Sequence, residues 1–364
     1  MRDTPEQAEL RSAVRSLLTR TEGGPATWRP LTGQIGAAAL AVPEEQGGLG
    51  CGVPELAVVA EELGRALSPL PYLGSAVLAT VALAEAGAPF PPGLADGARV
   101  AALAWAETDG WEPEAIATTA TRATWAAQAT QAAVPPESSG PAWYLSGVKE
   151  YVLTGPEAPD LVYAFARAPG GRLGLYAPAG PGVVCDAVPA LDRTRPLARI
   201  VFDRAPARLL CCDGERVLAR VRDVGAVALA AECVGAAGRA LDFTVRYAKD
   251  RVQFGRPIGA FQAVKHRLAD LHAEVEAARS LARAAAHADG TPAFPRLAAA
   301  AKSACTQAYR TVAAETVQLH GGIGITWEHP AHDHLKRAHG ASRLLGSPES
   351  HRARLAGLLG LNAA

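Results

Sequence analysis

The segment from Arg251 to Gln262, RVQFGRPIGAFQ, brings several chemically useful side chains into a short stretch of the chain. The guanidinium of Arg251 suits a diphosphate, and the amides of Gln253 and Gln262 both donate and accept hydrogen bonds. Phe254 offers an aromatic edge that can pack on a ring. These types fit a ligand that combines an anionic group with a flat ring. The alternative is an ordinary solvated hinge with Phe254 buried.

Two amphipathic helices must position these side chains. Apolar residues recur at helical spacing before the segment, from Leu241 to Ala248, and again after it, from Val264 to Val275. Pro257 halts the first helix, and the glycines beside it permit a tight turn. The segment is therefore predicted to be the bend of a helical hairpin.

A second stretch, VQLHGGIGIT, ends another long helical run. It places Gln318, His320, Gly321 and Gly322 where glycine is the expected helix terminator. Glycine also lets a ligand approach the backbone closely.

Together the two stretches resemble the acyl-CoA dehydrogenase family, flavoenzymes that desaturate acyl thioesters between the α and β carbons. Further segments resemble other family motifs in the same order along nearly the whole chain. They are VPEEQGGLG near the N-terminus, YLSGVKEYVLTG in the middle, and WEHP near the end.

The pattern of elements predicts an α+β multidomain fold. Residues 5 to about 90 read as helices, 98 to 210 as short strands separated by turn residues, and the remainder as helices again. We expect an N-terminal helical domain at 1–95, a central antiparallel β-domain at 96–212 and a C-terminal four-helix bundle at 213–364. The resemblance implies that the bundle also carries the cofactor and oligomer contacts.

Composition narrows the function. The formal charge is zero at pH 7, so no electrostatic footprint for nucleic acid or an anionic membrane is visible. The first residues lack the apolar core of a signal peptide, and no apolar run is expected to span a bilayer. We therefore expect a cytoplasmic protein. The cysteines lack metal-ligand spacing and are expected to be small core residues.

The resemblance implies FAD as cofactor and implies which residues hold it. In the family, the nucleotide end of FAD is held by the neighbouring subunit. Arg251 would face the diphosphate, Gln253 and Phe254 would line the flavin edge, and Gln262 would contact the adenosine. The diphosphate would also meet the end of the second stretch, at Gln318, Leu319, Gly321 and Gly322.

Other family positions have lost their chemistry. Ala106 and Leu153 replace two threonines whose hydroxyls would hydrogen-bond the flavin ring. Counting without gaps from Glu328 and Pro330, the position of the catalytic glutamate falls on Leu345, which cannot accept a proton. A minority of the family places the base on the first long bundle helix, and that position falls at Gly225.

These departures make the chain similar to the divergent, non-catalytic subunits of actinobacterial α2β2 acyl-CoA dehydrogenases, several of which act on steroid side chains. The resemblance implies a catalytic partner subunit, an acyl-CoA substrate and electron-transfer flavoprotein as electron acceptor. Two alternatives remain open. The chain is a homomeric acyl-CoA flavoenzyme with a relocated base, Asp223 or Glu232, or it is a catalytically dead acyl-CoA-binding scaffold.

Two groups of polar residues invite other readings. His329, His332, His334 and His339 crowd together and suggest a metal. A solvated or interface surface is the simpler interpretation, with His332 and Lys336 as an i,i+4 pair on a helix rich in charge. We expect no metal. Glu232 lies among small apolar residues, and a buried ion pair is favoured over a catalytic role.

Overall fold

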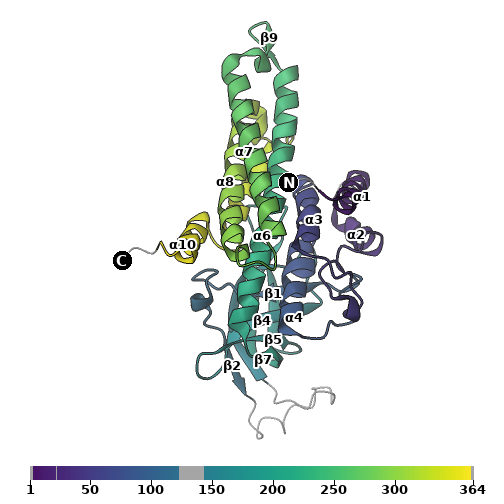
Figure 1. The fold of residues 1–364 in the computed structure, drawn as a ribbon, viewed down its shortest axis with the longest axis vertical. Helices are drawn as coiled ribbons and strands as arrows, with labels where there is room; N and C mark the ends of the chain where they lie inside the picture. Colours follow the sequence, from purple (N-terminus) through teal and green to yellow (C-terminus); the bar gives the residue numbers. More distant parts are fainter. Residues whose placement is uncertain (1–2, 22, 123–142, 362–364) are drawn as a thin grey trace.

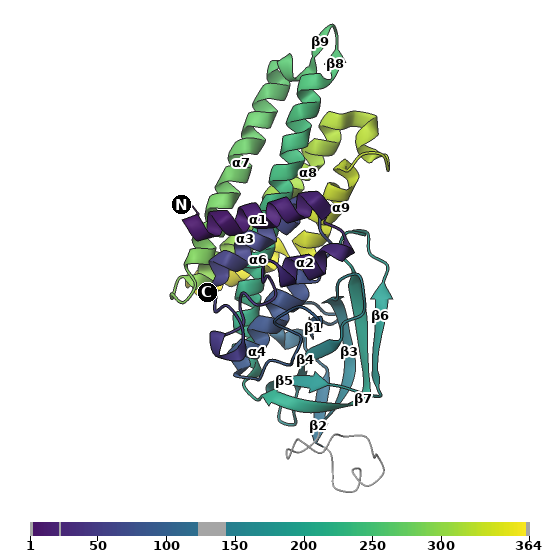
Figure 2. The same ribbon diagram turned by 90° about the vertical axis from the view of Figure 1, so that its right-hand side faces the viewer.

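The computed structural model describes residues 3–21, 23–122 and 143–361. Helices of the N-terminal part lie beside the long helix α6, the strands gather at one end of the molecule, and a helical hairpin projects from the other end (Figures 1 and 2). The expected sequence of helical, β and helical parts is confirmed. The boundaries at 95 and 212 fall between elements and stay a prediction.

The N-terminal part is helical from its first turn. Its elements are α1 (Pro5–Thr21), η1 (Pro25–Thr27), α2 (Trp28–Gly33), η2 (Glu44–Gln46), α3 (Val53–Arg65), the π-helix η3 (Tyr72–Ala79) and α4 (Thr80–Ala86). The backbone N–H of Gly52 donates to the carboxylate of Glu55 at 3.1 Å, which satisfies one of the donors that a helix start leaves unpaired and fixes where α3 begins.

The central strands close into a barrel. They are β1 (Ala101–Ala104), β2 (Thr119–Arg122), β3 (Trp143–Leu153), β4 (Leu161–Arg167), β5 (Leu173–Pro178), β6 (Val183–Val188) and β7 (Leu197–Cys211), with the short helix η4 (Pro113–Ala115) after β1. β4 pairs with β2, β2 with β3, β3 with β7, β7 with β5, and β5 with β4 again. Closure of this ring leaves β1 and β6 outside it.

The expectation of a purely antiparallel β-domain is wrong. β1 and β2 both run parallel to β4, because β4 returns between them after the long strand β3. Register shifts interrupt the pairing of β3 with β7 between Leu145 and Gly147 and between Lys149 and Val152.

The C-terminal part is the expected bundle. It comprises α6 (Gly214–Asp250), the hairpin β8 (Val252–Gln253) and β9 (Arg256–Pro257), η5 (Ile258–Ala260), α7 (Gln262–His287), α8 (Phe294–His320), η6 (Gly321–Ile325), α9 (Ala331–Arg343) and α10 (Pro348–Leu358). Ser347 caps α10 by accepting from the N–H of Ser350, with Pro348 at the first helical position.

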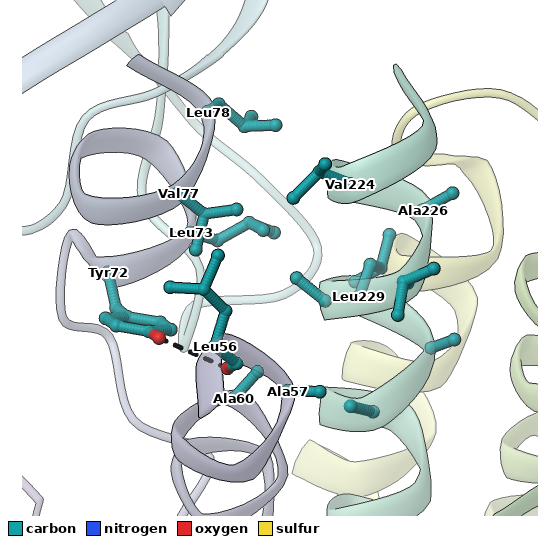
Figure 3. Packing of buried hydrophobic residues seen from close by; sticks show 14 of the residues in the cluster. Leu56, Ala57, Ala60, Tyr72, Leu73, Val77, Leu78, Val224, Ala226 and Leu229 are labelled. Carbon is teal, nitrogen blue, oxygen red and sulfur yellow. Dashed lines mark hydrogen bonds between the residues drawn. The ribbon is translucent and has the colours of Figure 1, made fainter. Parts of the chain in front are cut away.

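Helix α6 is the axis of the fold. By length and composition it could cross a membrane, contrary to the expectation that no apolar run is long enough, but 94% of its most apolar window is buried inside the protein. It is a core helix that touches all three parts of the chain. Figure 3 shows one of these contacts, where Leu73, Val77 and Leu78 of η3 face Val224 and Leu229 of α6.

Glycines let α3 and α6 touch backbone to backbone. A Cβ added at Gly235 would lie 1.8 Å from the carbonyl oxygen of Glu61, and one added at Gly64 would lie 2.0 Å from that of Glu232. No L side chain fits at either place, so the two helices approach as closely as helices can. The crossing fixes the N-terminal part against the bundle.

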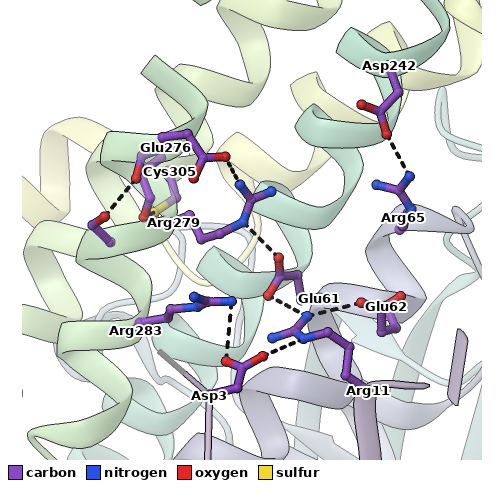
Figure 4. A network of polar contacts seen from close by, with 12 residues as sticks. Asp3, Arg11, Glu61, Glu62, Arg65, Asp242, Glu276, Arg279, Arg283 and Cys305 are labelled. Carbon is purple, nitrogen blue, oxygen red and sulfur yellow. Dashed lines mark hydrogen bonds and ion pairs between the residues drawn. The ribbon is translucent and has the colours of Figure 1, made fainter. Parts of the chain in front are cut away.

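A network of ion pairs surrounds this crossing (Figure 4). Arg11 of α1 contacts Asp3 at 2.7 Å, Glu61 at 2.8 Å and Glu62 at 3.0 Å. Arg279 of α7 reaches the same Glu61 at 3.0 Å. Glu61 of α3 is thereby shared between the first helix and the bundle, and the N-terminal helix is held to both.

We predict that Gly235→Ala destabilises the protein, because the new methyl group would collide with backbone that cannot move independently. Overpacking of this kind costs about 1–3 kcal/mol. Gly33→Ala is the control, since nothing lies within 4 Å of the Cβ position there. Urea unfolding of both variants checks this, and equal midpoints would contradict it.

Candidate functional site

The first predicted binding segment forms the exposed tip of the helical hairpin. α6 ends at Asp250, and β8, β9 and η5 turn the chain into α7. The N–H of Arg251 donates to the carbonyl of Tyr247, and the carbonyl of Arg251 accepts from Ile258, both at 2.8 Å. The backbone of the tip is therefore fixed while the side chains of Arg251, Gln253 and Gln262 remain exposed.

Phe254 is the most informative residue at this tip. Its side chain is 92% exposed, so the alternative of a buried hinge phenylalanine is wrong. Its φ of 51° lies in the left-handed region, which is costly for a bulky residue. A large apolar side chain held in a strained, exposed position is suited to contact another molecule.

The second predicted segment also lies at a helix end. α8 stops at His320, and Gly321 adopts a φ of 63° as the chain enters η6. Gln318, Gly321 and Gly322 are exposed, and Leu319 is half-buried. No atom lies within 4 Å of a Cβ built on Gly321 or Gly322, so their backbone is open to an approaching ligand.

One aromatic contact brings the two segments together. Tyr247, one helical turn before Arg251, stacks on the ring of His320 with centroids 4.3 Å apart. Its hydroxyl donates to the carbonyl of His320 at 3.4 Å. The C-terminal ends of α6 and α8 are therefore joined, and the polar side chains after each end lie on one side of the bundle.

The structure also identifies tip residues that the sequence analysis missed. Arg256 stacks on Phe261, with its guanidinium carbon 4.1 Å from the ring centroid, and Phe254 meets the same ring edge-on at 6.3 Å. Ile325, the last residue of η6, is 72% exposed, and Trp327, which follows η6, is 69% exposed. The sequence did contain a signal for Ile325 and Trp327, because both are bulky apolar residues close to a glycine-rich helix end.

Both positions at which the family carries its base are apolar, and they adjoin one another. A Cβ added at Gly225 would lie 3.1 Å from Cδ1 of Leu345 and 2.6 Å from Cδ2 of Leu78. Leu345 is buried and has a φ of 58°, a strained geometry for leucine. The side chains at this corner, formed by Gly225, Leu78 and Leu345, therefore cannot take up a proton.

The two relocated bases considered above are both engaged in ion pairs. Asp223 contacts Arg354 of α10 at 2.6 Å. Glu232 pairs with Arg195 and, at 2.9 Å, with Arg337. Burial alone would raise the pKa of Glu232, but these two guanidinium groups hold it below its ordinary value. A carboxylate held as the anion by two cations is a poor base, and the expected structural role of Glu232 fits this geometry.

The two positions that would hydrogen-bond a flavin ring are buried and apolar. Ala106 and Leu153 are both in the core. Next to them, Trp111 stacks on Tyr151 at 6.2 Å between centroids and meets Trp105 edge-on at 5.1 Å. Tyr151, like Phe254 and Leu345, has a positive φ, at 56°.

Three histidines that flank η6 pack around Phe243. The Phe243 ring centroid lies 5.5, 5.5 and 5.4 Å from those of His320, His329 and His334. His334 accepts or donates a hydrogen bond with the hydroxyl of Tyr309 at 3.0 Å. Among the described residues no group of three His, Cys, Asp or Glu side chains is arranged to hold a metal.

The interpretation of this region as a solvated surface is partly wrong, and its interpretation as an interface stays a prediction. The i,i+4 contact exists, since Lys336 Nζ lies 3.1 Å from Nδ1 of His332. However, His332 and His334 are buried, because α9 packs its histidine face against the bundle. The cysteine expectation is likewise only partly right: Cys233 and Cys305 are in the core, whereas Cys212 is exposed.

The chain has a helical N-terminal part, a closed β-barrel and a bundle of long helices. Comparisons with known proteins identify the family that shares this architecture. Residues 4–89 match the family "Acyl-CoA dehydrogenase, N-terminal domain", and residues 213–359 match "Acyl-CoA dehydrogenase, C-terminal domain". The chain is 39% identical to "Acyl-CoA dehydrogenase IpdE2" of Mycobacterium tuberculosis, over 94% of this chain and 90% of that protein.

Solved structures agree with these relatives. The "Tcur3481-Tcur3483 steroid ACAD G363A variant" superposes with a TM-score of 0.80 and 31% identity, covering 98% of each chain. A chain of the "ChsE4-ChsE5 complex from Mycobacterium tuberculosis" superposes with a TM-score of 0.83 and 26% identity, over 100% of this chain and 99% of that one. This chain belongs to the acyl-CoA dehydrogenase family, whose members are FAD-dependent oxidoreductases.

We predict that Leu345→Glu destabilises the protein by about 3 kcal/mol or more, because it buries a carboxylate among apolar side chains. The loss should be smaller at acid pH, where the neutral form is the one buried. Leu345→Met keeps the volume and should cost less than about 1.5 kcal/mol. Denaturant unfolding at two pH values tests this, and an L345E protein as stable as L345M at neutral pH would refute it.

We also predict that the free energy of unfolding decreases as the pH falls below about 6.5, the ordinary pKa of histidine. Burial, with Arg239 and Arg337 nearby, lowers the pKa of His334 to about 3, and burial lowers that of His351 to about 4. Both histidines are neutral in the folded protein and take up protons on unfolding. Their contribution to the free energy of unfolding is therefore complete above pH 6.5 and is lost as the pH falls toward the pKa values of the folded state.

The variant His334→Gln removes one of these protons and should therefore flatten the dependence of the unfolding midpoint on pH between 6.5 and 4. His266→Gln changes an exposed residue of α7 and is the matched control. Identical slopes for the H334Q variant and the unmodified protein would show that His334 is not linked to unfolding.

Proposed function

We propose that this chain is the non-catalytic subunit of a heteromeric FAD-dependent acyl-CoA dehydrogenase, and that it completes the FAD site of a catalytic partner. The observation that carries the proposal is the contrast between two regions of the same bundle. The tip offers exposed polar and aromatic groups to another molecule, whereas the corner where a base belongs contains Gly225, Leu78 and Leu345.

The residues at the tip fit the nucleotide end of FAD. Arg251 would supply a forked cation for the diphosphate, and the open backbone of Gly321 and Gly322 would supply N–H donors. Gln253 and Phe254 would line the flavin edge. Contacts to the adenosine side and the diphosphate would come from Gln262, Gln318 and Leu319. All of these proposed FAD-binding residues except Leu319 are exposed in the single chain. Residues that bind the FAD of a neighbouring subunit need this exposure.

When bound, FAD accepts a hydride from the β carbon of the acyl thioester. The proton at the α carbon must go to a carboxylate within hydrogen-bond reach. Since this chain offers none at either family position, the partner would contribute the glutamate and the hydroxyls that contact the flavin ring. The role of this chain is to bind and orient the nucleotide, and to close the site from across the interface.

The relatives suggest the kind of substrate and assembly. One similar structure is described as a steroid acyl-CoA dehydrogenase and another as a complex of two named chains. We propose an α2β2 assembly with a second acyl-CoA dehydrogenase and, as substrate, the CoA thioester of a steroid-derived group. Electron-transfer flavoprotein is the proposed acceptor and the cytoplasm the proposed location.

The homomeric alternative has less support. Asp223 and Glu232 are each neutralised by arginine, and Asp223 lies two residues from Gly225, about 200° around the helix from it. A scaffold that binds acyl-CoA without a flavin would leave the exposed tip without a role. Co-expression with the product of the neighbouring reading frame, as a candidate catalytic subunit, separates the three proposals. Native mass spectrometry should find flavin in the mixed complex alone; flavin on the isolated chain supports the homomer, and none anywhere supports the scaffold.

We predict that Arg251→Ala in this chain weakens FAD binding in the mixed complex by about 10- to 100-fold, because a desolvated cation–phosphate contact contributes about 1.5–3 kcal/mol. Turnover should return at saturating FAD, since the substitution leaves the partner's catalytic groups in place. Fluorescence titration of the apo complex with FAD measures the affinity.

The matched control is Arg296→Ala, which changes an exposed arginine in the first turn of α8. It lies roughly 36 Å along the helix from His320. Equal affinity of the R251A and R296A complexes for FAD would contradict the assignment of Arg251, even if both complexes form normally.

A further inference from the structure

Several bulky apolar side chains are exposed just beyond the end of α8. Ile323 and Ile325 of η6 are exposed, and so is Trp327, which follows η6. Leu191, in the loop between β6 and β7, is exposed two residues before Arg193, which contacts Trp327. Single exposed apolar residues are common, but a tryptophan among other bulky apolar residues is typical of a surface that another protein covers.

Two cations reach the indole ring of Trp327 from different parts of the chain. The guanidinium carbon of Arg193, in the β-domain, lies 4.9 Å from the ring centroid, and Nζ of Lys336 of α9 lies 4.0 Å from it. His332, also of α9, meets the ring edge-on with centroids 4.7 Å apart. These contacts hold the ring where the β-domain meets the bundle, and they place two positive charges beside an exposed aromatic side chain.

No carboxylate of the described residues neutralises these cations. Arg193 and Lys336 form no ion pair within the part of the chain that the structure describes. Glu328 follows Trp327 in the chain but pairs with neither cation, and the carboxylate of Asp333 lies 3.1 Å from Nδ1 of His332 instead. An exposed tryptophan beside two unpaired cations is complementary to a surface that carries carboxylates next to apolar side chains.

The backbone that carries Ile325 and Trp327 is fixed by local hydrogen bonds. The N–H and the hydroxyl of Thr326 both donate to the carbonyl of Ile323, at 3.1 and 2.9 Å. The N–H of Ala331 donates to Nδ1 of His329 at 3.2 Å. Because the segment is ordered before a partner arrives, binding to it costs little conformational entropy.

This exposed region continues the surface that is proposed to hold FAD. η6 begins at Gly321 and, as a 3-10 helix, is about 8 Å long, and Trp327 follows it within about 7 Å of extended chain. A standard interface covers about 800 Å² of each partner, equivalent to a disc of about 16 Å radius. A partner subunit whose flavin meets Gly321 is therefore close enough to cover Ile325 and Trp327 as well.

We propose that an acidic, apolar segment of the catalytic partner subunit docks on the Trp327 surface, which consists of Ile325, Trp327, Arg193 and Lys336. This inference rests on the proposed function, because it adds a direct protein contact to the contact that the same partner makes through FAD. Apolar side chains of the partner cover the Trp327 ring, and its carboxylates pair with Arg193 and Lys336. The surface thereby selects a partner by charge as well as by shape.

The primary test is the affinity between the two subunits, measured by sedimentation at saturating FAD so that flavin binding is equal in all complexes. Trp327→Ala should weaken association by about 30-fold or more, as truncation of a central interface tryptophan does. Val184→Ala shortens an exposed apolar residue of β6 and is the matched control. Equal affinities of the W327A and V184A chains for the partner would overturn the inference.

The outcomes separate this inference from the proposed function. If the unmodified chain forms no complex with the candidate catalytic subunit, or forms one without flavin, the proposed function is overturned and the docking surface with it. If the complex forms and holds flavin but W327A associates as tightly as the unmodified chain, only the docking surface is wrong.

Carbodiimide cross-linking of the unmodified complex tests the charge of the docked segment. The reagent joins an amine to a carboxylate in contact with it, so it should link Lys336 to an aspartate or glutamate of the partner. Lys336→Arg keeps the positive charge and should keep the affinity but lose this cross-link, because a guanidinium is not coupled. Cross-links to the partner from the exposed Lys249 or Lys265 alone would overturn the assignment of an acidic segment to the Trp327 surface.

Discussion

The close approach of α3 and α6 is the constraint on which the remaining structure depends. Gly64 and Gly235 bring the two backbones into contact at Glu232 and Glu61. The same crossing therefore places Glu232 in the junction of the three parts and Glu61 in the ion network with Arg11 and Arg279. With wider spacing, neither carboxylate would reach partners on both sides, and the N-terminal helices would lose their fixed orientation.

Charge and strain are distributed unevenly along the bundle. In the interior, Glu232 is neutralised by arginines, and Gly225 and Leu345 form an apolar contact. At the far end, Arg251 and Phe254 are exposed on a turn whose backbone is held by hydrogen bonds. Tyr151, Phe254 and Leu345 have positive φ angles, which are costly for bulky residues.

This uneven distribution of charged and apolar groups is the physical basis of the proposal that two subunits share one FAD site. Beside the end of β3, a small cavity lined by Leu153 and Gly155 adjoins the buried ion pair of Arg195 with Glu232. A subunit that contributes to another's flavin needs only a rigid, exposed edge. The stacking of Tyr247 on His320 supplies that rigidity by joining the ends of α6 and α8.

The sequence by itself determined the order of helical, β and helical parts, the two helix ends that carry Arg251 and Gly321, and the lack of a carboxylate at Leu345. These features depend on periodicity, on glycine and proline, and on residue type, which are local properties. It did not determine the parallel pairing of β1 and β2 with β4, the exposure of Phe254, or the burial of His332 and His334. Only the tertiary structure decided that Gly225 adjoins Leu345 and that Glu232 meets Arg195 and Arg337, because these contacts join residues far apart in the chain whose spacing carries no periodic signal.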